Sequence, residues 1–87
     1  MKRYGRKEAI EAVKAGNLIV DYDWYTIHAG YKVTTWNLDV LGYITFDLFM
    51  QLVNEGVIVK FGAHWSFQRY ADPSVLEDYK RECLANC

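Results

Sequence analysis

The sequence predicts an α+β domain, with a small antiparallel sheet and about three helices in the order α-βββ-α-ββ-α. Of the 87 residues, 52% are hydrophobic and 16% are aromatic, which is enough apolar material for one dense core. Segments with a helical hydrophobic period alternate with short β-branched and aromatic runs. Because no repeat or linker divides the sequence, we expect a single domain over residues 1–87.

The first predicted helix covers residues 6–15. Ala9, Ile10 and Val13 form one apolar strip, and charged side chains occupy the opposite side. Gly16 is expected to end this helix, because glycine accepts the left-handed backbone conformation of a C-terminal cap.

A three-stranded antiparallel meander is predicted next, with strands at 18–20, 24–27 and 31–36. These runs are rich in β-branched and aromatic residues, and Gly30 marks the turn before the third. Residues 37–42 are expected to form a loop.

The clearest helical pattern lies between Thr45, a good N-cap, and Gly56. Its apolar residues recur at helical spacing, which predicts a helix packed on the sheet: Phe46, Phe49, Met50 and Val53.

A hairpin and a last helix complete the predicted order. Strands are expected at 57–61 and 64–70, with a tight turn at Gly62-Ala63. Asp72 followed by Pro73 predicts the start of a helix, because proline suits the first helical position. The apolar stripe of this helix is Leu76, Tyr79 and Cys83.

Several features favour a cytoplasmic protein. Glu8 and Glu11 interrupt the N-terminal region where a signal peptide would be apolar. No apolar run approaches the roughly 20 residues that span a bilayer, so we expect no membrane partner. Cys83 and Cys87 both lie near the end of the chain, unlike the cysteines of a disulfide-stapled secreted domain.

The sequence contains no recognisable catalytic motif. It lacks a glycine-rich phosphate loop, a G-x-S-x-G elbow and an H-E-x-x-H pair. His64 and Ser66 share one face of a predicted strand, but no third group is evident to orient the imidazole. The spacing of Cys83 and Cys87 is a poor match to zinc sites. We expect no catalysis, no metal and no cofactor.

Charge is distributed unevenly along the chain. Residues 1–16 carry a net charge of +3 and residues 17–59 a net charge of −4, whereas residues 60–87 are balanced. The acidic middle is also aromatic. Tyr and Trp dominate interface hot spots, and carboxylates steer a domain toward basic partners. We therefore expect a protein partner with a basic surface, bound by Asp21, Asp23, Trp24, Tyr25, Trp36 and Asp39. The same aromatic residues would allow a homo-oligomer.

A second interpretation is a winged-helix-like DNA-binding or transcription-regulatory domain. Residues 44–70 resemble a recognition helix followed by a β-hairpin wing. However, strand-like sequence replaces the preceding helix, and the recognition helix carries Asp47 and Glu55 but no Lys or Arg. Phosphate binding would then depend on Lys2, Arg3, Arg6 and Lys7, so direct nucleic-acid binding is the less favoured alternative.

The N-terminal segment carries a further resemblance. Residues 7–20, KEAIEAVKAGNLIV, followed by Trp24, are similar to the start of the Tad2-like anti-defence family, with its short helix, glycine and strand leading to Trp. The resemblance implies a class of small phage or mobile-element proteins, anti-CRISPR proteins among them. Such proteins are typically compact inhibitors without catalysis that occlude a functional surface. No ligand-binding residue carries over from that family.

Overall fold

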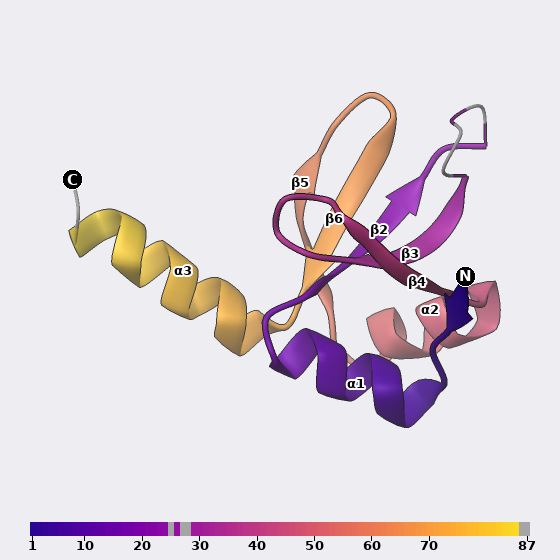
Figure 1. Ribbon diagram of the computed structural model, residues 1–87. Helices are drawn as coiled ribbons and strands as arrows, with labels where there is room; N and C mark the ends of the chain where they lie inside the picture. Colours follow the sequence, from indigo (N-terminus) through magenta and orange to yellow (C-terminus); the bar gives the residue numbers. More distant parts are fainter. Residues whose placement is uncertain (25, 27–28, 86–87) are drawn as a thin grey trace.

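Three α-helices and a six-stranded sheet make up the part of the chain that the structure describes. The computed structural model describes residues 1–24, 26 and 29–85, with side-chain surroundings through residue 81. In chain order (Figure 1) the elements are β1 (Lys2–Arg3), α1 (Arg6–Lys14), β2 (Leu18–Tyr22), β3 (Gly30–Thr34), β4 (Val40–Ile44), α2 (Phe46–Asn54), β5 (Val59–Ala63), β6 (Phe67–Ala71) and α3 (Pro73–Ala85).

The sheet is mixed, with strand order β1-β4-β3-β2-β6-β5. β1 runs parallel to β4, and every other neighbouring pair is antiparallel. The α+β class is thus confirmed, whereas the expected purely antiparallel sheet is wrong. β2 is central, with Ile19 opposite Val33 of β3 and Tyr70 of β6. Its three apolar residues Leu18, Ile19 and Val20 are fully buried, because side chains pack against them on both faces of the sheet.

The three predicted helices are confirmed, because their signals are local. Gly16 and Gly56, which follow α1 and α2, have left-handed φ values of 104° and 74°. Thr45 caps α2 by accepting the Leu48 N–H at 3.2 Å. Asp72 caps α3 in the same way, since its carboxylate accepts the Ser74 N–H at 2.8 Å.

The strand predictions were wrong in three places. A strand was expected at 24–27, but Trp24 lies in a turn and Thr26 in a bend; Tyr25 and Ile27 lie outside the described residues. A loop was expected at 37–42, yet β4 begins at Val40 and completes an antiparallel meander of β2, β3 and β4.

The third error concerns the hairpin turn. β5 extends through Ala63, so the turn is formed by residues 64–66 rather than by Gly62-Ala63. A register shift between Lys60 and Gly62 adds a residue to β5, which moves the turn along the chain.

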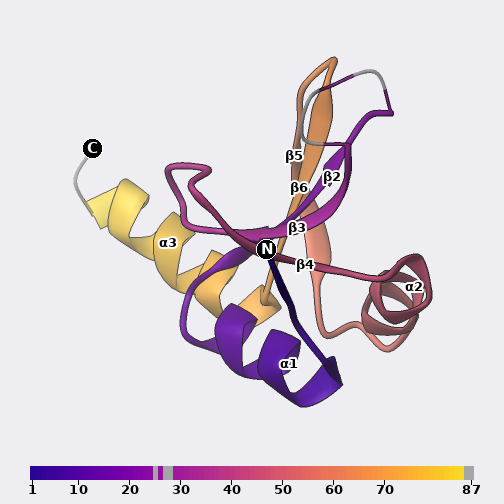
Figure 2. The same ribbon diagram turned by 45° about the vertical axis from the view of Figure 1, so that its right-hand side comes forward.

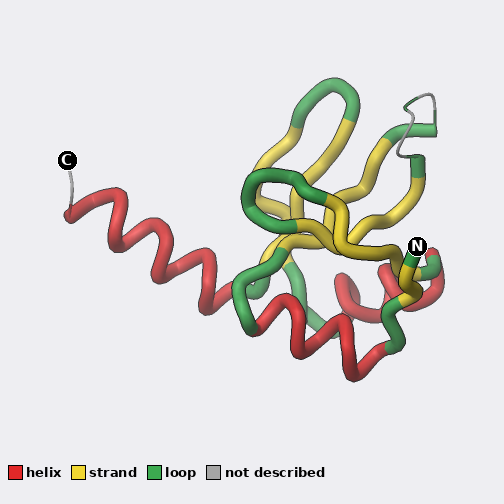
Figure 3. The backbone as a smooth tube through the Cα atoms, viewed as in Figure 1, coloured by secondary structure: helices red, strands yellow, loops and turns green. Residues whose placement is uncertain are grey.

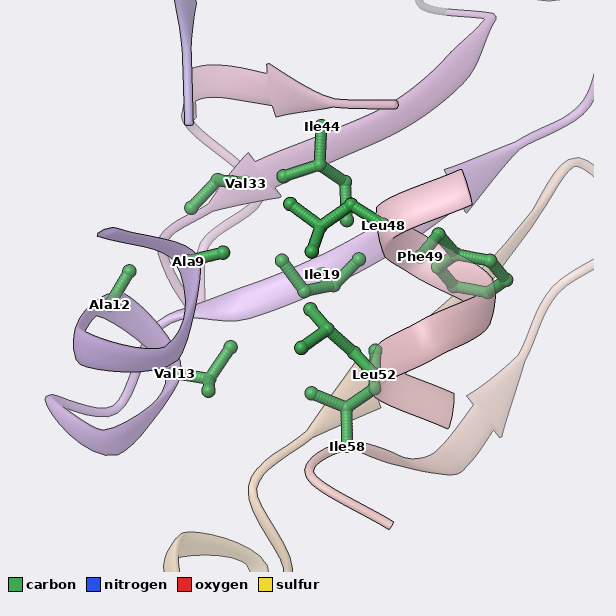
Figure 4. Close-up of a cluster of buried hydrophobic side chains, with 10 residues drawn as sticks. All are labelled: Ala9, Ala12, Val13, Ile19, Val33, Ile44, Leu48, Phe49, Leu52 and Ile58. Atoms are coloured by element: carbon green, nitrogen blue, oxygen red, sulfur yellow. The ribbon is translucent and has the colours of Figure 1, made fainter. Parts of the chain in front are cut away.

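Helices α1 and α2 cover one face of the sheet, which we call the helix face (Figures 1 and 2). Their buried side chains meet those of the central strands, as Figure 4 shows. The apolar positions at helical spacing in the two helices therefore build the main core. The buried residues of this core are Ala9, Ala12, Val13, Ile19, Val33, Ile44, Leu48, Phe49, Leu52 and Ile58.

The opposite face, the open face, is covered only in part. A smaller cluster contains buried Leu18, Val20, Tyr22, Ala71 and Leu76. α3 starts against this cluster and then extends away from the sheet (Figures 2 and 3). Of its predicted stripe, Leu76 is buried, Tyr79 is 48% exposed, and the Cys83 side chain lies outside the described residues.

Candidate functional site

The predicted partner-binding residues lie at two opposite ends of the sheet. In the β2–β3 pair, Tyr22 faces Gly30 at one end and Leu18 faces Thr34 at the other. Asp21, Asp23 and Trp24 belong to the first end. Trp36 and Asp39 follow Thr34 and so belong to the second, about 13 Å of strand away. Tyr25 lies outside the described residues.

Two neighbouring loops form the first end, which we call the tryptophan tip. It comprises Asp21, Asp23 and Trp24 at the end of β2 together with residues 64–66 between β5 and β6. The Asp23 N–H donates to the Ser66 carbonyl at 3.0 Å, joining the two loops. Trp24 and Trp65 are 87% and 75% exposed. Because Tyr22 lies opposite Phe67 in the β2–β6 pair, both tryptophans lie at the same end of the sheet.

Asp21 is the half-buried carboxylate of the tip. It lies opposite Tyr31 on β3 and Gln68 on β6. Burial raises the pKa of Asp21, and the negative charge of Asp23 raises it further. Ionised Asp21 is thus poorly compensated by its own surroundings, and an approaching cation would stabilise it.

Asp23 organises the loop that follows β2. Its carbonyl accepts the Thr26 N–H at 3.0 Å and the Thr26 hydroxyl at 2.9 Å. These contacts tie Asp23 to Thr26, and the bond to Ser66 ties it to the turn between β5 and β6. The exposed Trp24 follows Asp23 directly, so its place at the tip is set by these bonds.

His64 and Ser66 form a local contact within the hairpin turn. The Ser66 N–H donates to His64 Nδ1 at 3.3 Å, and the Ser66 hydroxyl lies 3.0 Å from the same atom. The imidazole stacks on Phe67 with ring centroids 4.8 Å apart. With Nδ1 engaged by the turn itself, this pair shapes the loop that carries Trp65.

Sequence reasoning missed Trp65 as a tip residue. The expected strand at 64–70 placed it within a β-ladder, whereas the structure has it in the turn. The only local signal for this shift is Gly62, which marks the irregular pairing with β6.

At the second end, Asp39 and Trp36 have structural partners. The Asp39 N–H donates to the Thr35 hydroxyl at 3.2 Å, and the Thr35 N–H donates to the Asp39 carbonyl at 3.0 Å. These bonds close the turn between β3 and β4. Trp36 packs against Phe61 and Tyr79, with ring centroids 5.4 and 5.0 Å apart.

A cleft opens beside Trp36 on the open face. Its volume is about 760 Å³, and it lies between the β3–β4 turn, the β5–β6 strands and α3. We call it the α3 cleft. Sequence reasoning did not identify it, because its cations come from three separate elements: Lys60, Arg69 and Lys80.

The N-terminal cations that the winged-helix interpretation requires are partly paired. Lys2 lies 2.9 Å from Glu8, and Arg6 makes a two-pronged contact with Glu55 of α2. The hydrogen bond from Arg6 holds the pKa of Glu55 below its ordinary value, and the hydrogen bond with Glu8 raises the pKa of Lys2. Two of the four cations are thus already matched by carboxylates.

In the part of the chain with described side chains, no three His, Cys, Asp or Glu residues gather into a group that could hold a metal ion. Over those same residues, no helix is long and apolar enough to cross a membrane. Comparisons with protein-family models, curated proteins and solved structures give no match to this chain. What the molecule binds must therefore be inferred from its own side chains.

Proposed function

We propose that this chain is a non-catalytic inhibitor that binds a protein through the tryptophan tip. Its partner presents a basic groove, as the nucleic-acid-handling proteins of bacterial defence systems do, and the tip occludes that groove. The supporting observation is the pair of tryptophans, 87% and 75% exposed, on two joined loops at one end of the sheet. A phage-encoded anti-defence role, in the cytoplasm of a bacterial host, agrees with the N-terminal resemblance.

Shape supports a tip that enters a groove. The β5–β6 hairpin projects from the end of the sheet (Figure 1), and Asp23 is joined to it by the hydrogen bond to Ser66. Tryptophan is enriched in hot spots because it fills a desolvated pocket while its indole N–H keeps a polar partner. Trp24 and Trp65 are thus suited to be the anchors.

Charge supports a basic partner. Asp21 and Asp23 lie beside Trp24. Burial of Asp21 and the negative charge of Asp23 both raise the pKa of Asp21, so its ionisation is costly. A lysine or arginine from the partner would relieve that cost, so the carboxylates favour cationic surfaces over neutral ones. Asp39 and Trp36 are left out of this surface because they lie at the opposite end of the sheet.

The test is a pull-down from nuclease-treated bacterial lysate, read by mass spectrometry, with the wild type and a Trp24→Ala/Trp65→Ala double variant as bait. We expect a stoichiometric partner with the wild type and its loss with the double variant. The purified partner should also bind nucleic acid less well when the wild-type chain is present. Binding to the chain should weaken with salt, because screening reduces attraction between charges.

One further tip variant and two control variants test the surface itself. Asp23→Asn should weaken capture, whereas Asp47→Asn, which removes an exposed carboxylate from α2, should not. Phe46→Ala removes a large exposed apolar side chain from α2 and should also leave capture unchanged. Retention of the partner by the Trp24→Ala/Trp65→Ala variant would exclude the tip as the binding surface.

A further inference from the structure

The α3 cleft combines an aromatic wall with a cluster of cations. Trp36, Phe61 and Tyr79 line it, as do Lys60, Arg69 and Lys80. Its volume of about 760 Å³ lies within the usual range of small-molecule sites. Among the residues that the structure describes, no aspartate or glutamate lines the cleft.

The aromatic wall is built by residues from three elements. Trp36 stacks on Tyr79 of α3, with ring planes inclined by 25°, and is tilted by 44° against Phe61 of β5. These contacts hold the rings in a fixed arrangement. Such a wall suits a planar ring, because bases stack on aromatic side chains in nucleic-acid complexes.

The cations are available to a ligand. Among the residues that the structure describes, none of Lys60, Arg69 and Lys80 forms an ion pair with a carboxylate. An anion bound between Arg69 and Lys80 would therefore meet positive charge without displacing a carboxylate. Guanidinium and ammonium groups in this arrangement are typical of phosphate sites.

Arg69 is held in place by its neighbours. Its guanidinium carbon lies 5.0 Å from the Phe61 ring centroid, over the ring. On the paired strand, Gly62 leaves room for the guanidinium, since a Cβ there would lie 2.5 Å from Arg69 Nη2 and 2.8 Å from Nε. The absence of a side chain at Gly62 thus allows Arg69 to lie flat across β5.

We propose that the α3 cleft binds a nucleotide, with the base against the aromatic wall and the phosphate on Arg69 and Lys80. A nucleotide is the common biological ligand that joins a planar ring to a phosphate across a few ångströms. The bound nucleotide is either free in solution or one residue of a single-stranded nucleic acid. This site is separate from the tryptophan tip, so it does not depend on the proposed protein partner.

Intrinsic fluorescence provides the measurement. In a Trp24→Phe/Trp65→Phe background, Trp36 is the remaining tryptophan and lies in the cleft wall. Titration with AMP should quench its emission, and the affinity should fall as salt is raised. A single-stranded oligonucleotide of about ten residues provides the second arm. Tighter binding of the oligonucleotide would assign the cleft to a strand; equal or weaker binding would assign it to free nucleotides.

Two probes separate a nucleotide from its parts. Adenosine and inorganic phosphate should each bind at least about tenfold more weakly than AMP, because each engages only one half of the cleft. Equal binding of phosphate and AMP would overturn the proposal in favour of a simple anion site. Absence of binding by both AMP and the oligonucleotide would overturn it outright.

Three variants test the residues. Arg69→Ala should weaken AMP binding at least about tenfold, as expected for loss of a charged contact. Gly62→Ala keeps the charge but displaces the guanidinium, so it should also weaken binding. Lys80→Ala should weaken AMP binding as well. Because Lys80 is an exposed helix position, this variant should fold even if the two sheet variants do not. The control is Lys14→Ala on helix α1, which should leave the affinity for AMP unchanged. A loss of AMP affinity in this variant equal to that in Arg69→Ala would contradict the assignment.

Discussion

The rings of Trp36 and Tyr79 stack with centroids 5.0 Å apart, and this contact joins the turn after β3 to the middle of α3. Leu76, one helical turn earlier, is buried in the smaller cluster on the open face. Beyond these two anchor points the helix extends away from the sheet (Figure 2). Trp36 therefore serves the attachment of α3 and the wall of the cleft, whereas Trp24 at the other end of the sheet is exposed.

The two tryptophans should differ sharply in their effect on stability. We expect Trp36→Ala to lower the free energy of unfolding by about 2 kcal/mol, because it removes a half-buried ring and its aromatic contacts. Trp24→Ala should change it by less than about 0.5 kcal/mol. Urea denaturation followed by circular dichroism measures both. Equal losses in the two variants would contradict the assigned roles.

Asp21 should cost stability at neutral pH. Its raised pKa means that the folded state binds the proton more tightly than the unfolded state, so the ionised carboxylate disfavours folding. Asp21→Asn should then increase the free energy of unfolding at pH 7 by about 0.5 kcal/mol, a value reduced by solvent screening.

The pH dependence of this effect provides its control. The advantage of Asp21→Asn should shrink as pH falls through the folded-state pKa of Asp21, and vanish below the unfolded-state pKa of about 4. Thermal melts of both proteins across this range measure it. In the same variant we expect weaker capture of the protein partner, so that greater stability accompanies poorer binding.

Gly42 should be required for the docking of β1. A Cβ at this position would collide with the Lys2 carbonyl and lie 2.5 Å from the Tyr4 ring. We expect Gly42→Ala to displace β1 from β4 and to lower the free energy of unfolding by about 1–3 kcal/mol. Hydrogen exchange should show faster exchange of the Tyr4 N–H, which donates to the Tyr43 carbonyl. Gly5→Ala, whose Cβ would meet nothing closer than 3.7 Å, should leave the exchange of the Tyr4 N–H unchanged.

The N-cap of α2 should contribute to stability through a single oxygen. Thr45→Ala removes the acceptor of the Leu48 N–H and should cost about 1 kcal/mol. Thr45→Ser keeps the hydroxyl and should cost much less. Thermal unfolding of the two variants compares them directly, and an equal loss would show that the methyl group of Thr45, not its hydroxyl, is what matters.

The sequence by itself determined the three helices and the strand at Leu18-Ile19-Val20, whereas the central place of that strand came from its pairing with β6. A helix is specified by side chains within a turn or two of one another, so the apolar spacing of α2, the Thr45 cap and the glycines after α1 and α2 could be interpreted locally. The run Leu18-Ile19-Val20 is apolar enough to indicate a strand buried on both faces.

Only the tertiary structure decided strand pairing and the grouping of functional residues. β1 has two residues and exists through its partner β4, and the shift at Lys60 and Gly62 that moves the hairpin turn to Trp65 arises from pairing with β6. The acidic and aromatic residues of the middle segment form no single surface, because antiparallel strands carry Asp23 and Trp36 to opposite ends. Arg69 and Lys80 line one cleft only because α3 packs beside β5 and β6. Such contacts depend on residues far apart in the chain, which local patterns do not encode.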